Sequence, residues 1–342
     1  MGLPEKCEIS LQHKFKKGER NLITDVKGVT VGHVSLRDDE RGIHTGVTAI
    51  RPHGGNLFQD KVMAAASVIN GFGKSAGLLQ IEELGTIETP IIMTNTLSVG
   101  TALNALTKYM LEENPDIGVT TGTVNCVVTE CNDGVLNDIR GMHVTEEDVT
   151  EALRRCDITF EEGAVGSGSG MCCMELKGGI GSASRVIPVD EAEYTIGAIV
   201  MSNFGMQGNL RIDGVRTATE LLPPGRETEQ GSIIMILATD LPLSERQLKR
   251  VAKRSVVALG RTGSFLGNGS GDIAIAFSTA NRIPHYSKKK ILDVKMYHDD
   301  ALDTVFEATA EVVEEAIISS MYHADTMKGI RDKVIYGLRE FL

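Results

Sequence analysis

The adjacent residues Gly231 and Ser232 are the feature of the sequence that most directly suggests a chemical reaction. They stand between a polar, proline-containing stretch and the apolar run IIMILATD. The Ser232 hydroxyl can attack the carbonyl carbon of Gly231, because glycine has no side chain to obstruct this strained approach. An N→O shift and hydrolysis would then free an α-amine on Ser232, which can activate its own hydroxyl without a histidine. The pair therefore predicts self-cleavage that creates an N-terminal nucleophile. It is also compatible with an ordinary junction between a loop and a strand.

Two glycine-rich segments resemble known catalytic motifs but lack a required residue. Residues 71–75, GFGKS, look like the end of a phosphate-binding loop, yet the position of its first glycine is occupied by Val68. Residues 166–170, GSGSG, are not a nucleophile elbow, because the central position of G-x-S-x-G is Gly168. Neither segment predicts nucleotide binding or a serine-hydrolase elbow.

The histidines and cysteines do not form a metal-binding pattern. The eight histidines are scattered, none pairs at i, i+4, and there is no HExxH motif. Cys172 and Cys173 are adjacent, and Cys126 lies five residues before Cys131, so CxxC spacing is absent. We expect no metal, no other cofactor, and free thiols in a reducing cytoplasm. The spacing of serines and histidines neither favours nor excludes a charge-relay histidine.

Hydrophobic periodicity predicts the elements that must position this chemistry. Strands are expected at 22–36, 42–55, 89–96, 123–133, 193–205, 233–240 and 272–281. Helices are expected at 98–114, 144–156, 243–263 and 299–325, and residues 62–84 are expected to form two helices around a glycine-rich turn. Residues 1–20 are interpreted as a loosely held N-terminal arm, and 205–231 as an exposed, flexible loop. Without an internal repeat, residues 21–342 are expected to form one large α+β domain.

Composition and charge exclude several classes of protein. Of the 342 residues, 42% are hydrophobic and 24% are charged, which is typical of a globular chain. A net charge of −11 without a basic block disfavours nucleic acid as a partner. No apolar run approaches the roughly 20 residues that span a bilayer, and residues 1–20 lack a signal-peptide core. We therefore expect a cytoplasmic protein that does not insert into membranes.

Several longer blocks of sequence match a known family in order. They are NLITDVKGVTVGHVSL, HTGVTAIRPHGGN, NGFGKSAGL, ELGTIETPIIMTNTLSVGTALNAL, ECNDGVLNDIRGMHV, KGGIGSASR, YTIGAIVMSNFG, GSIIMILATDLPLS and GNGSGDIAIAFSTAN. From Asn21 onward the chain resembles the DmpA family of N-terminal-nucleophile aminopeptidases, also called the P1 family, which includes D-, L- and β-peptidyl aminopeptidases. The resemblance implies an αββα sandwich and autocatalytic cleavage into chains 1–231 and 232–342. It also implies a homo-oligomer, a tetramer or larger.

The same resemblance implies roles for individual residues. Ser232 matches the serine nucleophile, which would release the N-terminal residue from a short peptide or amino-acid amide through an acyl-enzyme. Ser270 and Asp272 match a Ser-x-Glu pair that orients the amine and the hydroxyl of this nucleophile, although the aspartate is shorter than the usual glutamate. Asn203 matches the side-chain donor to the oxyanion.

Three further residues match the substrate-binding part of the family pattern. Glu130 matches the carboxylate that holds the free amino terminus of the substrate. Asn132 stands where relatives carry an aromatic or aliphatic residue, so only its backbone N–H is expected to serve the oxyanion. Asn95, in the block MTNT, matches a polar supporting position.

Two alternative functions stay open at this point. One is an acyltransferase similar to the ornithine acetyltransferases, although self-cleavage there precedes a threonine rather than a serine such as Ser232. The other is a family member that never matures and serves in assembly or binding. The sequence does not distinguish D- from L-residues or α- from β-peptides as substrates.

Overall fold

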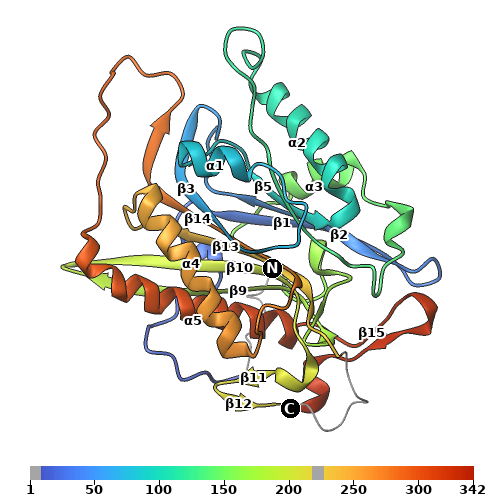
Figure 1. The fold of residues 1–342 in the computed structure, drawn as a ribbon. Coiled ribbons are helices and arrows are strands. Elements are labelled where there is room, and N and C mark those ends of the chain that lie inside the picture. Colours follow the sequence, from blue (N-terminus) through green and yellow to red (C-terminus); the bar gives the residue numbers. More distant parts are fainter. Residues whose placement is uncertain (1–8, 218–226) are drawn as a thin grey trace.

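The computed structural model describes residues 9–217 and 227–342 as two packed β-sheets with helices on both outer sides (Figure 1). The strands are β1 (Thr30–Asp38), β2 (Ile43–Arg51), β3 (Asp60–Gly71), β4 (Thr86–Ile87), β5 (Ile91–Asn95), β6 (Val127–Cys131), β7 (Cys172–Cys173), β8 (Leu176–Lys177), β9 (Gly179–Val189), β10 (Ala192–Asn203), β11 (Arg211–Ile212), β12 (Val215–Arg216), β13 (Gln230–Thr239), β14 (Gly269–Pro284), β15 (Met327–Lys328) and β16 (Val334–Ile335). The α-helices are α1 (Leu78–Leu84), α2 (Val99–Glu113), α3 (Glu146–Arg154), α4 (Glu245–Thr262) and α5 (Leu302–Tyr322).

The larger sheet has six strands in the order β4-β3-β14-β13-β10-β9, and the smaller has four in the order β1-β2-β5-β6. In the larger sheet, β13 runs parallel to β14 and antiparallel to β10. Alternate side chains of β13, such as Ile234 and Ile236, share a buried cluster with Ile91 of β5 and Val127 of β6. The two sheets therefore bury their inner faces against each other, as in a β-sandwich.

Helices cover the outer face of each sheet. The α4–α5 pair packs on the larger sheet, and α2 and α3 pack on the smaller (Figure 1). Ser244 caps α4, and its side chain accepts a hydrogen bond from the backbone N–H of Gln247. The order helix, sheet, sheet, helix confirms the predicted α+β, αββα architecture. Within the part of the chain that the structure describes, no helix is both long and apolar enough to cross a membrane.

The expectation of a helix at the beginning of residues 62–84 is wrong. Residues 60–71 form strand β3, whose pairing partner is β14. A short run of alanine and valine has no periodicity that separates a buried strand from a helix, so tertiary pairing decides. The second helix of that stretch, α1, is present. Residues 205–217 hold the β11–β12 hairpin, whereas residues 218–226 of the predicted loop lie outside the described residues.

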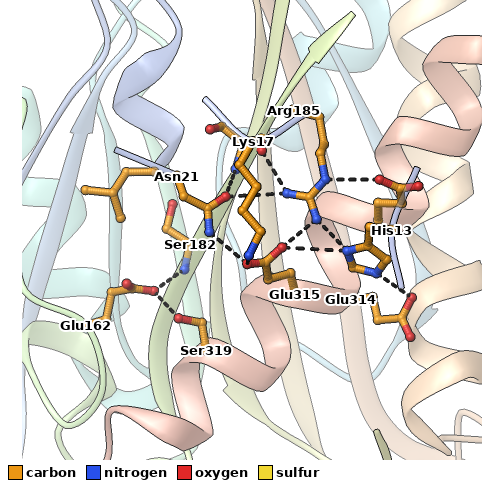
Figure 2. Close-up of polar contacts among 12 residues, drawn as sticks. His13, Lys17, Asn21, Glu162, Ser182, Arg185, Glu314, Glu315 and Ser319 are labelled. Atoms are coloured by element: carbon orange, nitrogen blue, oxygen red, sulfur yellow. Dashed lines mark hydrogen bonds and ion pairs between the residues drawn. The ribbon is translucent and has the colours of Figure 1, made fainter. Parts of the chain in front are cut away.

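The N-terminal arm is held more closely than expected where the structure describes it. The backbone N–H of Lys14 donates to Glu311 of α5 at 2.8 Å, and the Lys17 ammonium donates to Glu315 at 2.6 Å. Figure 2 shows His13 and Lys17 reaching α5 beside Arg185 of β9. Residues 9–20 are thus fixed to the outer helix by ionic contacts, because its carboxylates face them, and residues 1–8 lie outside the description.

Candidate active site

Ser232 lies near the start of the central strand β13, between strands β10 and β14. Its register partners are Asn203, the last residue of β10, and Gly271 of β14. Paired residues of neighbouring strands project to the same face of a sheet. The side chains of Ser232 and Asn203 therefore share one face, the face that carries Ile234 toward the smaller sheet.

The residue before the nucleophile has to be glycine in this structure. Gly231 has φ +118°, and a Cβ built on it would lie 1.9 Å from the carbonyl oxygen of Asn203. Any other residue would both adopt a disfavoured backbone conformation and collide with β10. The close approach of β10 therefore requires glycine before Ser232, which is the residue type that the hypothesis of self-cleavage uses at this position.

A cavity of about 590 Å³ opens onto the Ser232 side chain. It is lined by four of the predicted site residues and by the cleavage-site glycine, together with residues of the segment after β3 and of β7. The lining residues are Phe72, Lys74, Thr96, Glu130, Asn132, Gly134, Val135, Ile139, Cys172, Asn203, Gln230, Gly231, Ser232 and Gly269. The predicted nucleophile, oxyanion donor and amine-binding carboxylate therefore face one space.

The carboxamide of Asn203 is fixed by hydrogen bonds at both ends. Its Oδ1 accepts from the backbone N–H of Cys172 at 2.8 Å, which identifies the oxygen and nitrogen of the amide. Its Nδ2 donates to the backbone carbonyl oxygen of Asn132 at 2.9 Å. A primary amide has two N–H groups, so one remains for a ligand in the cavity. This arrangement suits a preorganised donor to a developing negative charge.

Glu130 lies near the end of strand β6 and is only 3% exposed, yet it lines the cavity. Its Oε1 accepts from the backbone N–H of Lys74 at 2.8 Å, and its Oε2 accepts from the hydroxyl of Thr96. These two donors hold the carboxylate in a defined orientation. Each oxygen retains lone pairs, so the group can still bind a substrate ammonium by charge-assisted hydrogen bonds.

Asn95 is buried and does not belong to the cavity lining. It caps the short 3₁₀ turn Thr96–Ser98, where its Oδ1 accepts from the backbone N–H groups of Leu97 and Ser98. Its Nδ2 donates to the hydroxyl of Thr45. Asn95 thereby positions the turn from which Thr96 reaches Glu130, which is an indirect form of the supporting role that the sequence suggests.

The structure places Ser270 and Asp272 on the opposite face of the sheet from the Ser232 hydroxyl. Ser270 pairs with Gly231, whereas Gly271 is the residue that shares the face of Ser232. The Ser270 hydroxyl donates to Asp272 at 2.7 Å, and both side chains are buried. Among the described residues, the Ser232 hydroxyl makes no hydrogen bond to this pair. Because the backbone nitrogen lies in the plane of the sheet, the pair can act on the amine of Ser232 but does not contact the hydroxyl.

The pKa of Asp272 is raised to about 6. Burial is the main cause, the hydrogen bond from Ser270 opposes it, and the charge of Glu229 raises the pKa further. The second carboxylate oxygen of Asp272 has no hydrogen-bond partner among the described residues. A buried carboxyl with an open oxygen and a pKa in this range can exchange a proton near neutral pH.

Nine residues of the cavity lining were not predicted from the sequence as site residues. They are Phe72, Lys74, Thr96, Gly134, Val135, Ile139, Cys172, Gln230 and Gly269. Phe72 and Lys74 belong to the GFGKS segment, which lacks the first glycine of a phosphate loop but still forms a turn into the site. Glycines between a strand and a helix were the available signal for this turn. Thr96 and Cys172 carried no comparable signal, because a threonine in a turn and a buried cysteine are common.

In the ranges 9–217 and 227–342, no group of three or more His, Cys, Asp or Glu side chains is arranged to hold a metal ion. Within the same ranges Cys126, Cys131, Cys156 and Cys173 are free thiols.

The αββα sandwich, with a serine on its central strand beside a fixed carboxamide and a carboxylate, belongs to the Ntn-hydrolase-like class of folds. The sequence model described as Peptidase family S58 matches residues 21–335, and the chain belongs to this family. As the DmpA resemblance predicts, the chain is a hydrolase of the aminopeptidase class. Family membership favours the peptidase over the acyltransferase alternative.

Similar proteins of known sequence and structure cover nearly the whole chain. Beta-peptidyl aminopeptidase BapA of Sphingosinicella microcystinivorans is 38% identical over 98% of this chain and 89% of its own length. A solved structure from Pyrococcus horikoshii superposes with a TM-score of 0.91 at 57% identity, covering 97% of this chain and 94% of that one. The L-aminopeptidase D-Ala-esterase/amidase from Ochrobactrum anthropi gives 0.88 at 39% identity, with coverages of 96% and 93%, and is described as a variant of the Ntn hydrolase fold.

Proposed function

We propose that this protein is an aminopeptidase that matures by cutting its own chain between Gly231 and Ser232. The observation that carries the proposal is the shared cavity in which Ser232, the fixed Asn203 carboxamide and the Glu130 carboxylate meet. The requirement for glycine at position 231 supports the cleavage site.

In maturation, the Ser232 Oγ attacks the Gly231 carbonyl carbon, and the peptide C–N bond breaks as an ester forms. Water then hydrolyses that ester. The products are a chain of residues 1–231 with a new carboxylate and a chain of residues 232–342 with a new amine on Ser232. The released amine can then serve as general base for the hydroxyl of the same residue.

In turnover, Ser232 Oγ attacks the carbonyl carbon of the substrate's first residue while the Ser232 amine takes the hydroxyl proton. The remaining N–H of Asn203 and the backbone N–H of Asn132 hold the oxyanion, a type of contact worth roughly 3 kcal/mol per donor. The amine returns the proton to the leaving nitrogen. Water activated by the same amine then hydrolyses the acyl-enzyme.

The substrate class we propose is short peptides or amino-acid amides with a free amino terminus. Glu130 supports this choice, because a fixed carboxylate selects an ammonium at one distance from the nucleophile. The relatives named as β-peptidyl aminopeptidases make β-amino-acid residues a substrate class to include in assays. We further propose a homo-oligomeric, cytoplasmic enzyme that needs neither metal nor cofactor, so activity should persist in EDTA.

Intact-mass measurement of the purified protein tests this function directly. The wild-type chain should yield residues 1–231 and 232–342, with the smaller chain beginning Ser-Ile-Ile-Met. Ser232→Ala should remain one chain and hydrolyse nothing, because alanine has no Oγ. Ser287→Ala, at an exposed serine, is the matched control and should mature and react like wild type. A fully active enzyme that stays as one intact chain would refute the proposal.

A further inference from the structure

Lys177 is a fully buried lysine next to the candidate active site, and it takes no part in the chemistry proposed for Ser232. Its ammonium donates to the backbone carbonyl oxygens of Gly168 at 3.2 Å, Met171 at 2.8 Å and Gly178 at 2.7 Å. An ammonium has three donors, so its hydrogen-bonding capacity is filled. Among the described residues it forms no ion pair with a carboxylate. A buried charge without a direct counter-ion is costly, and such groups are commonly functional.

The three carbonyl groups that Lys177 binds lie before and after the strands of a short hairpin. Strands β7 and β8 form this hairpin, and Cys172 of β7 lies opposite Lys177 of β8. The two residues between the strands, Met174 and Glu175, have φ values of +52° and +60°. Two successive positive φ angles produce the tight turn of a two-residue hairpin but disfavour side chains other than glycine. The hairpin is therefore held by contacts from outside its turn, and the hydrogen bonds of the Lys177 ammonium are among them.

This hairpin supplies one of the two contacts that fix the Asn203 carboxamide. The backbone N–H of Cys172, at the start of β7, donates to Asn203 Oδ1. Met171, the residue before it, carries one of the carbonyl groups bound by Lys177. The path from the buried ammonium to the oxyanion donor is thus a single peptide group with one hydrogen bond at each end.

The second contact of Asn203 is supported from the same buried region. Asn203 Nδ2 donates to the carbonyl oxygen of Asn132, and the next residue, Asp133, is fully buried. A Cβ on Gly170 would lie 2.8 Å from the Asp133 Cβ, so the loop before β7 packs directly on Asp133. Asp133 also accepts from Asn137 Nδ2 at 3.0 Å.

Asp133 and Lys177 influence each other's charge within this region. Burial raises the pKa of Asp133 to about 7, and Lys177 opposes that rise. Burial lowers the pKa of Lys177 to about 8, while Cys172, Asp133 and Cys173 oppose that fall. Each of the two groups lies next to one of the backbone segments that hold Asn203.

We propose that Lys177 is a positioning residue for the Asn203 carboxamide, and that it sets the orientation of the oxyanion donor by binding the backbone on both sides of the β7–β8 hairpin. The inference rests on the proposed role of Asn203 in stabilising the oxyanion. Lys177 touches neither substrate nor nucleophile, so it acts only through Asn203.

A double-mutant cycle separates this role from a general structural one. Lys177→Met keeps the length and apolar stem of the side chain but removes the ammonium. Rates of p-nitroanilide hydrolysis are expressed per matured chain, counted by intact mass, in Lys177→Met, Asn203→Ala and the double variant. Lys177→Met should lose about 10- to 100-fold in kcat with KM changed by less than about twofold, because a misplaced donor affects the transition state selectively. In the Asn203→Ala background, adding Lys177→Met should lower kcat by less than about a further twofold.

The outcomes distinguish failure of this inference from failure of the proposed function. If Asn203→Ala reacts at the wild-type rate, the oxyanion role of Asn203 is wrong. If Asn203→Ala is impaired but Lys177→Met is not, or if the two losses multiply in the double variant, the inference about Lys177 is wrong and the proposed function stands.

A matched control and a second variant keep the test decisive. Lys61→Met removes another largely buried ammonium, paired with Glu88 at the far end of β3, and should leave kcat unchanged. If Lys177→Met does not fold, Lys177→Arg replaces it, since arginine keeps the charge but moves the donors. Lys177→Arg should lower kcat at constant KM and show the same coupling to Asn203, and a wild-type kcat in this variant contradicts the inference. Where a variant matures slowly, its rate of self-cleavage replaces kcat in the cycle.

Discussion

Two side chains of this molecule, Arg185 and Lys177, are cations with no exposed surface, and they are held in opposite ways. Arg185 of β9 binds the carboxylates of Glu311 and Glu315 on α5 and contacts His13 of the N-terminal arm (Figure 2). Lys177 donates to backbone carbonyl oxygens. The first cation joins β9 to α5 through opposite charges and reaches the N-terminal arm through His13, whereas the second shapes one short stretch of backbone.

This contrast separates a contact that holds the fold from one that shapes the site. Removing Arg185 would leave two carboxylates buried without their partner, which is the costly case for an ion pair. Removing Lys177 leaves neutral carbonyl groups, which lose hydrogen bonds but no counter-charge. We therefore expect loss of stability at the arm and loss of rate at the site, and the following predictions test that division.

The largest change in stability is expected for Arg185→Met. Because Glu311 and Glu315 stay buried, unfolding in urea should show a loss of about 3–5 kcal/mol. The kcat of the folded, matured enzyme should be unchanged, since Arg185 lies on the outer helix-facing side of the sheet. The control Arg246→Met breaks an exposed pair with Asp299 and should cost at most about 1 kcal/mol. Equal losses in the two variants would remove the basis of the comparison.

Glu130→Gln should affect rate and leave stability nearly unchanged. The amide keeps the shape and can still accept from Lys74, but it loses the charge that pairs with a substrate ammonium. We expect kcat/KM on free-amine substrates to fall by one to two decades, at about 1.4 kcal/mol per decade. Wild type should not cleave N-acetylated substrates, and the variant should discriminate less against them.

Glu191→Gln, at an exposed glutamate of the β9–β10 turn, is the control for Glu130→Gln. It should behave as wild type in maturation and in turnover. Wild-type rates in Glu130→Gln, or equal cleavage of free and acetylated substrates by the wild type, would assign Glu130 a structural role only.

Asp272→Asn should change how stability depends on pH. The pKa of Asp272 is raised in the folded state, so its contribution to stability is full below the ordinary carboxyl range and is lost as pH rises through about 6. The wild type should therefore lose stability over this window, and the variant, which has no titrating group at this position, should show a flatter profile. Urea unfolding from about pH 4 to about pH 7 measures the slope, and identical slopes in both proteins would contradict the raised pKa.

The smallest effect is expected for His13→Gln in the arm. Burial lowers the pKa of His13, but the hydrogen bonds to Glu314 and Glu315 outweigh this effect, so the pKa is raised overall. The charge of Arg185 opposes the rise, and the charge of Glu311 adds to it. The contribution to stability is therefore full below the ordinary histidine range and is lost as pH rises through the raised value. Thermal unfolding should show this loss in wild type and not in the variant, and no difference would place His13 outside the network.

The fold was predictable from the sequence where local patterns and tertiary structure agree. The amphipathic helices and the apolar strands such as IIMILATD were predictable from periodicity, and the family blocks located Ser232, Asn203 and Glu130. The alanine-rich β3 was not predictable, because its identity as a strand comes from pairing with β14, far along the chain.

The sequence was equally unable to predict which site residues lie on opposite faces of the sheet. Ser270 and Asp272 lie close to Ser232 in register but face the other way, and only the pairing of Ser232 with Gly271 reveals this. In the sequence, Lys177 is an ordinary lysine before two glycines, because its burial depends on carbonyl groups of a separate loop.

The strand order has a consequence for the molecularity of folding. Strand β14 and nearly all of β13 come from residues 232–342, yet they lie between β3 and β10, which come from residues 1–231. After the proposed cut, neither chain alone contains a continuous six-stranded sheet. Unfolding of the cut enzyme would then be a first-order process, whereas refolding would require two chains to meet and would slow on dilution. Self-cleavage would thus replace one chain that can refold by itself with two chains that must find each other again after unfolding.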